Sequence, residues 1–147
     1  GLKPPPEPRL GYAGAYRIDD RNSGYLSVQG RVRFKGREGL FDDVVGKGWQ
    51  LLARGHTDPL VVDGDAQDVL QQMRAVRADF GPSGDTKDLD GVYGAWFDRL
   101  GAEAVLVRPD FYVFGSSSLA DVDALLKSAR TLLGTSGREP AGTAKTG

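Results

Sequence analysis

The chain has 147 residues, the size of one ordinary domain, with 39% hydrophobic and 27% charged residues. Its 19 Lys and Arg residues nearly balance 20 Asp and Glu residues, and the net charge of −1 argues against binding to nucleic acid or to an anionic membrane. The sequence has no cysteine, which excludes disulfides, zinc–thiolate sites and thiol chemistry, and no apolar run has the length of a bilayer span. We expect a globular, cytoplasmic domain.

Composition divides the chain into three parts. Residues 1–10 are rich in proline and predict a stiff linker. Residues 11–134 carry the periodic apolar patterns of one domain, and residues 135–147 are rich in Gly, Thr and Ala, as in a flexible tail. Because the first residue is Gly rather than Met, we expect the chain to be processed or excised from a longer protein.

The first half predicts a strand, a short helix and a second strand. In residues 31–35, apolar and basic side chains alternate, which predicts a strand with one solvated face. Four cations fall on or beside this strand, and we interpret them as protection of a sheet edge: Arg31, Arg33, Lys35 and Arg37. Residues 40–45 predict a short helix ended by Gly46, and residues 48–54 predict the second strand.

Two helices are expected next. The first begins at a capping acid, Asp63 or Asp65, and its apolar residues share one face. These are Val69, Leu70, Met73 and Val76. A weak strand is expected near residues 78–80. The strongest amphipathic pattern, over residues 89–100, predicts a second helix that ends at Gly101.

The last part predicts a β-hairpin and a helix. Residues 104–115 form two apolar stretches around Pro109–Asp110, a pair suited to the centre of a turn. Residues 116–118 are expected to form a loop, with Ser118 and Asp121 as a capping box for a final helix that Gly134 closes. This order of elements predicts a thioredoxin-like α/β sandwich with a central mixed sheet, a C-terminal β-hairpin and a final helix.

The candidate sites are weak. His56, the only histidine, lies beside Asp58 without a nucleophile to activate, so a loop is the simpler interpretation. The Gly46–Leu51 segment ends in Leu and precedes a strand, whereas a dinucleotide-binding turn follows one. Residues 64–66 superficially resemble the Gly-Asp-Ala of flavin monooxygenases but are better explained as a helix start.

Acidic, aromatic and turn residues are also expected to be structural. Asp88 and Asp90 fit a helix N-terminus better than a calcium loop, since Phe97 occupies the position that needs a bidentate Glu. The aromatic residues Trp49, Tyr93, Trp96 and Phe97 are expected in the core. Arg108 and Asp110 are interpreted as turn residues of the hairpin, with an ion pair of Arg108 as an option.

Three blocks in order give the chain a family resemblance: Gln29–Val32, Phe41–Leu52, and Leu106–Asp110 with Tyr112–Val113. Together they resemble the C-terminal region of FAD-dependent aromatic hydroxylases, the phenol hydroxylase and 3-(3-hydroxyphenyl)propionate hydroxylase group, over roughly positions 1 to 134. Phe111 stands where many relatives have Gly, a departure that bears on the turn geometry.

The resemblance implies a thioredoxin-like region without a Cys pair, which serves architecture and, in some members, subunit contacts. It places FAD, NAD(P)H and the phenolic substrate in the preceding FAD and substrate domains, so we assign no catalytic, cofactor-binding or metal residue here. The expected partners are those domains of the parent chain and, as an option, a second subunit. The alternative is an independent thioredoxin-like interaction module without redox activity.

Overall fold

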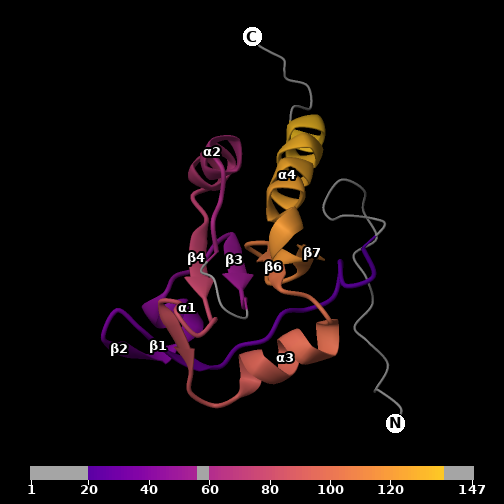
Figure 1. Ribbon diagram of the computed structural model, residues 1–147. Coiled ribbons are helices and arrows are strands. Elements are labelled where there is room, and N and C mark those ends of the chain that lie inside the picture. Colours follow the sequence, from indigo (N-terminus) through magenta and orange to yellow (C-terminus); the bar gives the residue numbers. More distant parts are fainter. Residues whose placement is uncertain (1–19, 56–59, 138–147) are drawn as a thin grey trace.

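The computed structural model describes residues 20–55 and 60–137. Its elements follow in the order β1 (Arg31–Phe34), β2 (Arg37–Leu40), α1 (Phe41–Val44), β3 (Gln50–Ala53), α2 (Gly64–Met73), β4 (Val76–Asp79), β5 (Thr86–Asp88), α3 (Val92–Leu100), β6 (Ala104–Val107), β7 (Val113–Ser117), a 3-10 turn η1 (Leu119–Asp121) and α4 (Val122–Gly137). The strands form one sheet of four and one sheet of three (Figure 1).

The four-stranded sheet has the order β4-β3-β6-β7. β3 and β4 are parallel and are connected through α2, whereas β6 is antiparallel to both β3 and β7. This mixed sheet, followed by its C-terminal hairpin and the final helix, agrees with the sandwich expected from the sequence. The predicted hairpin is confirmed as β6 and β7.

Both faces of this sheet are covered by helices. Successive residues of a strand face opposite sides, so Leu51 packs with α2 and α4 while Leu52 packs with α3. Figure 1 shows α2 and α4 on one side of the sheet and α3 on the other. Tyr93, Trp96 and Phe97 of α3 are at most 2% exposed, as expected for core residues. This double covering explains why residues 51–53 of β3 and all of β6 are continuous apolar runs.

The three-stranded sheet corrects the prediction for the strand at residues 31–35. β1 is antiparallel to both β2 and β5, so it lies in the middle of the sheet and is not an edge strand. Its apolar residue Val32 is fully buried, while Arg31 and Arg33 are exposed. β2 and β5 were not expected, because their sequences, Arg-Glu-Gly-Leu and Thr-Lys-Asp, lack the apolar alternation that predicts a strand.

The helix boundaries differ from the prediction where the backbone leaves the helical region. Asp63 caps α2, since its carboxylate accepts the Ala66 N–H at 2.8 Å. Arg74, with φ of 54°, ends α2, so Val76 starts β4 and is not part of the helix face. α3 begins at Val92 rather than at residue 89, and Gly101 ends it as predicted.

The final helix also begins and ends differently. Ser116 and Ser117 belong to β7 rather than to a loop. The capping box is wrong: the Ser118 hydroxyl contacts the Asp121 carboxylate at 3.3 Å and makes no capping bond to the backbone, and η1 precedes α4. α4 continues through Gly137, beyond the expected end at Gly134, because its backbone stays helical across that glycine.

The segment before β1 covers the outer edge of β7. Gly24 donates its N–H to the Val113 carbonyl at 2.7 Å, and Val113 donates to the Tyr25 carbonyl at 2.8 Å. The Asp20 carboxylate accepts both the N–H and the hydroxyl of Ser116, at 2.5 and 2.9 Å. These bonds protect the sheet edge and hold the incoming chain against the hairpin.

Candidate functional site

A polar pocket of about 330 Å³ lies between the hairpin turn, α1 and the start of β3. Its lining residues are Gln29, Asp42, Lys47, Gly48, Gln50, Arg108, Pro109 and Phe111. All except Phe111 belong to the three blocks that carry the family resemblance. The tertiary structure therefore brings those blocks together around one pocket, which is the candidate site of the chain.

A network of side-chain amides forms one wall of the pocket. The buried Gln50 amide donates to an Asp42 carboxylate oxygen at 2.9 Å and to the Gly46 carbonyl at 3.1 Å. The Gln29 amide oxygen accepts the Asp42 N–H at 3.1 Å, which is one of the N–H groups that a helix start leaves without a partner. The network links α1 and β3 to the segment that precedes β1, so its first role is to hold these three parts together.

The hairpin turn also lines the pocket, through Arg108, Pro109 and Phe111. The Arg108 carbonyl accepts the Phe111 N–H at 2.9 Å, closing a turn with Pro109 and Asp110 at its centre. Arg108 forms an ion pair with Asp110 at 2.5 Å, which agrees with the interpretation of both as turn residues. Phe111 has φ of 74°, a conformation that favours Gly, and this explains why the departure at this position matters.

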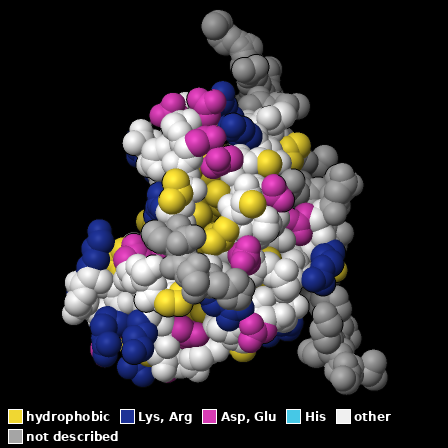
Figure 2. Space-filling model, viewed as in Figure 1, with side chains coloured by type: hydrophobic (Ala, Val, Ile, Leu, Met, Phe, Trp, Pro, Cys, Tyr) yellow, Lys and Arg dark blue, Asp and Glu magenta, His cyan; other side chains and the backbone are white. Residues whose placement is uncertain are grey.

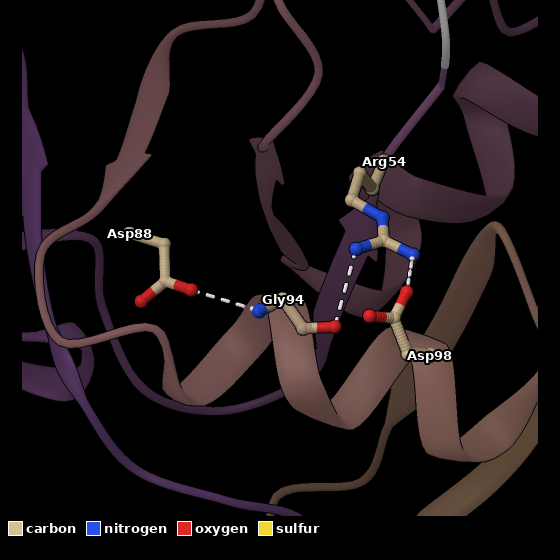
Figure 3. Close-up of polar contacts among 4 residues, drawn as sticks. All are labelled: Arg54, Asp88, Gly94 and Asp98. Carbon is tan, nitrogen blue, oxygen red and sulfur yellow. Dashed lines mark hydrogen bonds and ion pairs between the residues drawn. The ribbon is translucent and has the colours of Figure 1, made fainter.

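A second polar cluster lies at the carboxyl end of β3 (Figure 3). Arg54 donates to the Gly94 carbonyl at 3.1 Å and to the Asp98 carboxylate at 2.6 Å, and its guanidinium lies 5.3 Å from the centre of the Phe97 ring. On the other side of the same helix turn, the Asp88 carboxylate accepts the Gly94 N–H at 2.8 Å. The cluster fastens α3 to the sheet. Sequence reasoning missed Arg54, although an Arg directly after an apolar strand was a usable signal.

Residues 24–132 match the model of the HcaD C-terminal domain. The chain belongs to this family. A relative from Rhodococcus jostii (strain RHA1), named a probable NADH-specific resorcinol 4-hydroxylase, is 33% identical over an alignment of 102 residues. The alignment covers 64% of this chain and 19% of the relative. The chain thus spans about a fifth of that protein's length. The expected resemblance to the C-terminal region of flavin-dependent aromatic hydroxylases is confirmed.

One solved structure shares the fold of this HcaD C-terminal domain, and a second is similar to it in part. The flavin-dependent monooxygenase PieE, solved with FAD and substrate, matches with a TM-score of 0.53 and 22% identity, over 76% of this chain and 20% of PieE. Aklavinone-11 hydroxylase, solved with FAD and aklavinone, matches with a TM-score of 0.49 and 21% identity, over 82% of this chain and 26% of the hydroxylase. In the part of the chain that the structure describes, no helix could cross a membrane.

The glycines of this HcaD C-terminal domain do not fit FAD. Gly46 and Gly48 have φ of 135° and 90° and lead from α1 into β3, as predicted, so they do not join a strand to a helix. Residues 64–66 form the first turn of α2, next to its capping acid Asp63. We therefore derive no step of flavin chemistry from this chain.

Asp88 and Asp90, and their neighbour Asp85, form hydrogen bonds within the domain. Asp85 accepts the Asp79 N–H at 2.9 Å, and Asp88 accepts an N–H of α3, as expected for an acid at a helix start. Asp90 contacts the Arg31 N–H at 3.3 Å. Within residues 20–55 and 60–137, no cluster of three His, Cys, Asp or Glu side chains could hold a metal ion. His56 and Asp58 lie outside the described residues.

Among the residues that the structure describes, two titratable groups have shifted pKa values, and both shifts have structural causes. Burial raises the pKa of the Tyr93 hydroxyl, which accepts the Gly30 N–H at 3.3 Å. The Ala66 N–H lowers the pKa of Asp63, the cap of α2. Neither group lines the polar pocket, so neither shift supplies that pocket with an acid or a base.

Proposed function

We propose that this chain is the non-catalytic, C-terminal structural domain of an FAD- and NAD(P)H-dependent aromatic monooxygenase that acts on a phenolic substrate. The observation that carries the proposal is the match of residues 24–132 to a family of C-terminal domains. The Rhodococcus relative supports the class of parent enzyme, since its name describes an NADH-specific hydroxylase of a phenol, and this chain spans 19% of it.

The geometry of the two polar clusters supports a structural role. Around the pocket, the side chains of Gln29, Asp42 and Gln50 bond to one another or to the backbone. At the end of β3, Arg54 bonds to a carbonyl of α3 rather than projecting from the surface. Side chains held in this way make a rigid body, which is what a domain that supports a neighbouring catalytic unit requires.

The proposal is tested by adding FAD to the purified 147-residue chain and following the flavin absorbance and fluorescence. We expect no saturable binding and no oxidation of NADH or NADPH in the presence of phenols. The same preparation is checked for folding by circular dichroism. Binding of FAD by the folded chain at micromolar concentration would refute the non-catalytic role. The sequence of the gene upstream of residue 1 tests the parent enzyme: we expect it to encode a flavoprotein.

We further propose that the domain contributes to contacts between subunits of the parent enzyme. Val61, just before α2, is the most exposed large apolar side chain among the described residues, at 77%, and it is therefore the position at which we test this contact. Light scattering of the parent enzyme tests this role. Val61→Asp should lower its mass relative to the wild-type protein, while Gln72→Asp on the exposed side of α2 should not. An unchanged mass in both variants would remove Val61 from the interface.

A further inference from the structure

The three-stranded sheet has one face in the core and one open face. Val32 and Phe34 of β1 pack against the core with α3, so Arg31 and Arg33 point to the opposite side. The register places Arg33 opposite both Glu38 and Lys87, and Arg31 opposite Leu40. Among the described residues, no helix covers this face. We call these five residues, together with Lys35 in the adjacent turn, the basic face.

Positive charge is concentrated on this sheet. Residues 31–40 and 86–88 contain five cations and two acids, a net charge of +3 in a chain whose total is −1. Figure 2 shows Lys and Arg side chains gathered over β1 and β2 at the lower left, and Asp and Glu side chains over α2 at the top. A domain with separated charges attracts a partner of opposite sign to one particular side.

The cations of the basic face are free to exchange partners. Arg33 pairs with Glu38 at 2.5 Å, but the two side chains are 49% and 44% exposed. Such surface pairs contribute little stability, so a partner's carboxylate can replace them at little cost. Lys87 is exposed and has no ion pair among the described residues. Leu40 is 45% exposed in the same face, and its neighbour across the strands is Arg31, a residue type that is enriched at protein interfaces.

A groove of about 490 Å³ lies at the end of the basic face, between the β1–β2 turn and the loop that joins β4 to β5. Arg33, Lys35 and Lys87 line it, with Phe80 as an apolar wall. Two carboxylates also line the groove, and both bond to the domain itself: Asp85 accepts the Thr86 hydroxyl at 2.8 Å and a backbone N–H, and Asp88 accepts the Gly94 N–H at 2.8 Å. The groove therefore offers cations and an apolar surface to a side chain that enters it.

We propose that the basic face docks against an acidic surface of the preceding, flavin-binding part of the same polypeptide, and that the groove receives an acidic side chain from it. The inference rests on the proposed function. The length of chain outside this domain supports that occupant, since the domain spans only about a fifth of its relative. A broad sheet face with an exposed Leu fits a protein surface better than a small anion, which would use the groove alone.

Acetylation of lysines tests the docking, because the chain carries its own controls. Lys35 and Lys87 belong to the basic face, whereas the exposed Lys47 and Lys127 lie elsewhere. Reaction rates are measured in the isolated chain and in the full-length enzyme. We expect Lys35 and Lys87 to react about tenfold more slowly in the enzyme, as for a docked state favoured by ten to one. The rate at Lys127 should stay the same. Equal rates at Lys35 and Lys87 in both proteins would overturn the docking.

Charge reversal gives a second measurement. In the full-length enzyme, Arg33→Glu combined with Lys87→Glu should return Lys35 to the rate of the isolated chain, whereas the control pair Lys127→Glu and Arg130→Glu, on exposed positions of α4, should leave it protected. If Lys35 stayed protected from acetylation in the Arg33→Glu and Lys87→Glu variant, the role of charge in the docking would be overturned. Protection that appears in the isolated chain on raising its concentration would identify a second copy as the partner instead. A gene without an upstream flavoprotein would overturn both proposals, while unprotected lysines in an intact flavoprotein would overturn the docking alone.

Discussion

Replacement of Gly94 by Ala should stabilise the domain, although Gly94 lies within the polar cluster of Arg54 and Asp88. Gly94 is in α3, where a glycine costs roughly 0.5–1 kcal/mol relative to alanine because it loses more backbone freedom on folding. An added Cβ would lie 3.5 Å from the Asp88 carboxylate and 3.9 Å from the Arg54 guanidinium, which are ordinary van der Waals distances. We therefore expect a gain of about 0.5–1 kcal/mol in the free energy of unfolding.

The gain is measured by urea unfolding of the 147-residue chain and by its melting temperature, which should rise by roughly 2–4 °C per kcal/mol for a domain of this size. Gly84→Ala is the matched control. There the added Cβ would clash with the Asp79 backbone carbonyl oxygen, so a loss of about 1–3 kcal/mol is expected. A Gly94→Ala variant less stable than the wild type would refute the arrangement of Arg54 and Asp88 around this helix turn.

The remaining predictions concern a cluster, a cap and a turn. Arg54→Met should lower the free energy of unfolding by about 1–2 kcal/mol through loss of a bond to a helix carbonyl and of a cation–π contact. Asp98→Ala should lower the free energy of unfolding by less than about 0.5 kcal/mol, because this carboxylate is 74% exposed. If urea unfolding gave equal losses for Arg54→Met and Asp98→Ala, the stabilisation would come from the ion pair rather than from the bond to the helix carbonyl. Asp63→Ala should lower the melting temperature at neutral pH. Folding lowers the pKa of Asp63, so the ionised carboxylate stabilises the domain above the ordinary value of 3.8, and this stabilisation is lost as the pH falls through the folded-state pKa. The difference in melting temperature between the wild type and Asp63→Ala should therefore shrink at about pH 2. A difference that stays constant with pH would contradict this. Phe111→Gly should be about 1 kcal/mol more stable than Phe111→Ala, since both lose the ring but only Gly relieves the positive φ; equal stabilities would contradict the strain.

Much of the local structure could be predicted because it depends on neighbours in the sequence. The hairpin was recognisable from its Pro109–Asp110 turn between two apolar stretches, and Gly101 marked the end of α3. α2 was recognisable from its capping acid, but its end was not. Val76 continues the helical spacing, yet it lies in β4, because the left-handed Arg74 turns the chain into a strand that pairs with β3. Tertiary pairing decided that boundary.

The sequence by itself determined that this chain has no thiol chemistry, that two apolar stretches meet at a Pro109–Asp110 turn, and that three blocks resemble the aromatic hydroxylases. It did not determine that these blocks surround one pocket, that β1 lies in the middle of a sheet, or that Arg54 fastens α3. Periodicity reports whether one face of a segment is buried, which is a local property. Pairing between distant strands depends on the whole chain, and for short polar strands such as β2 and β5 only the tertiary structure decided it.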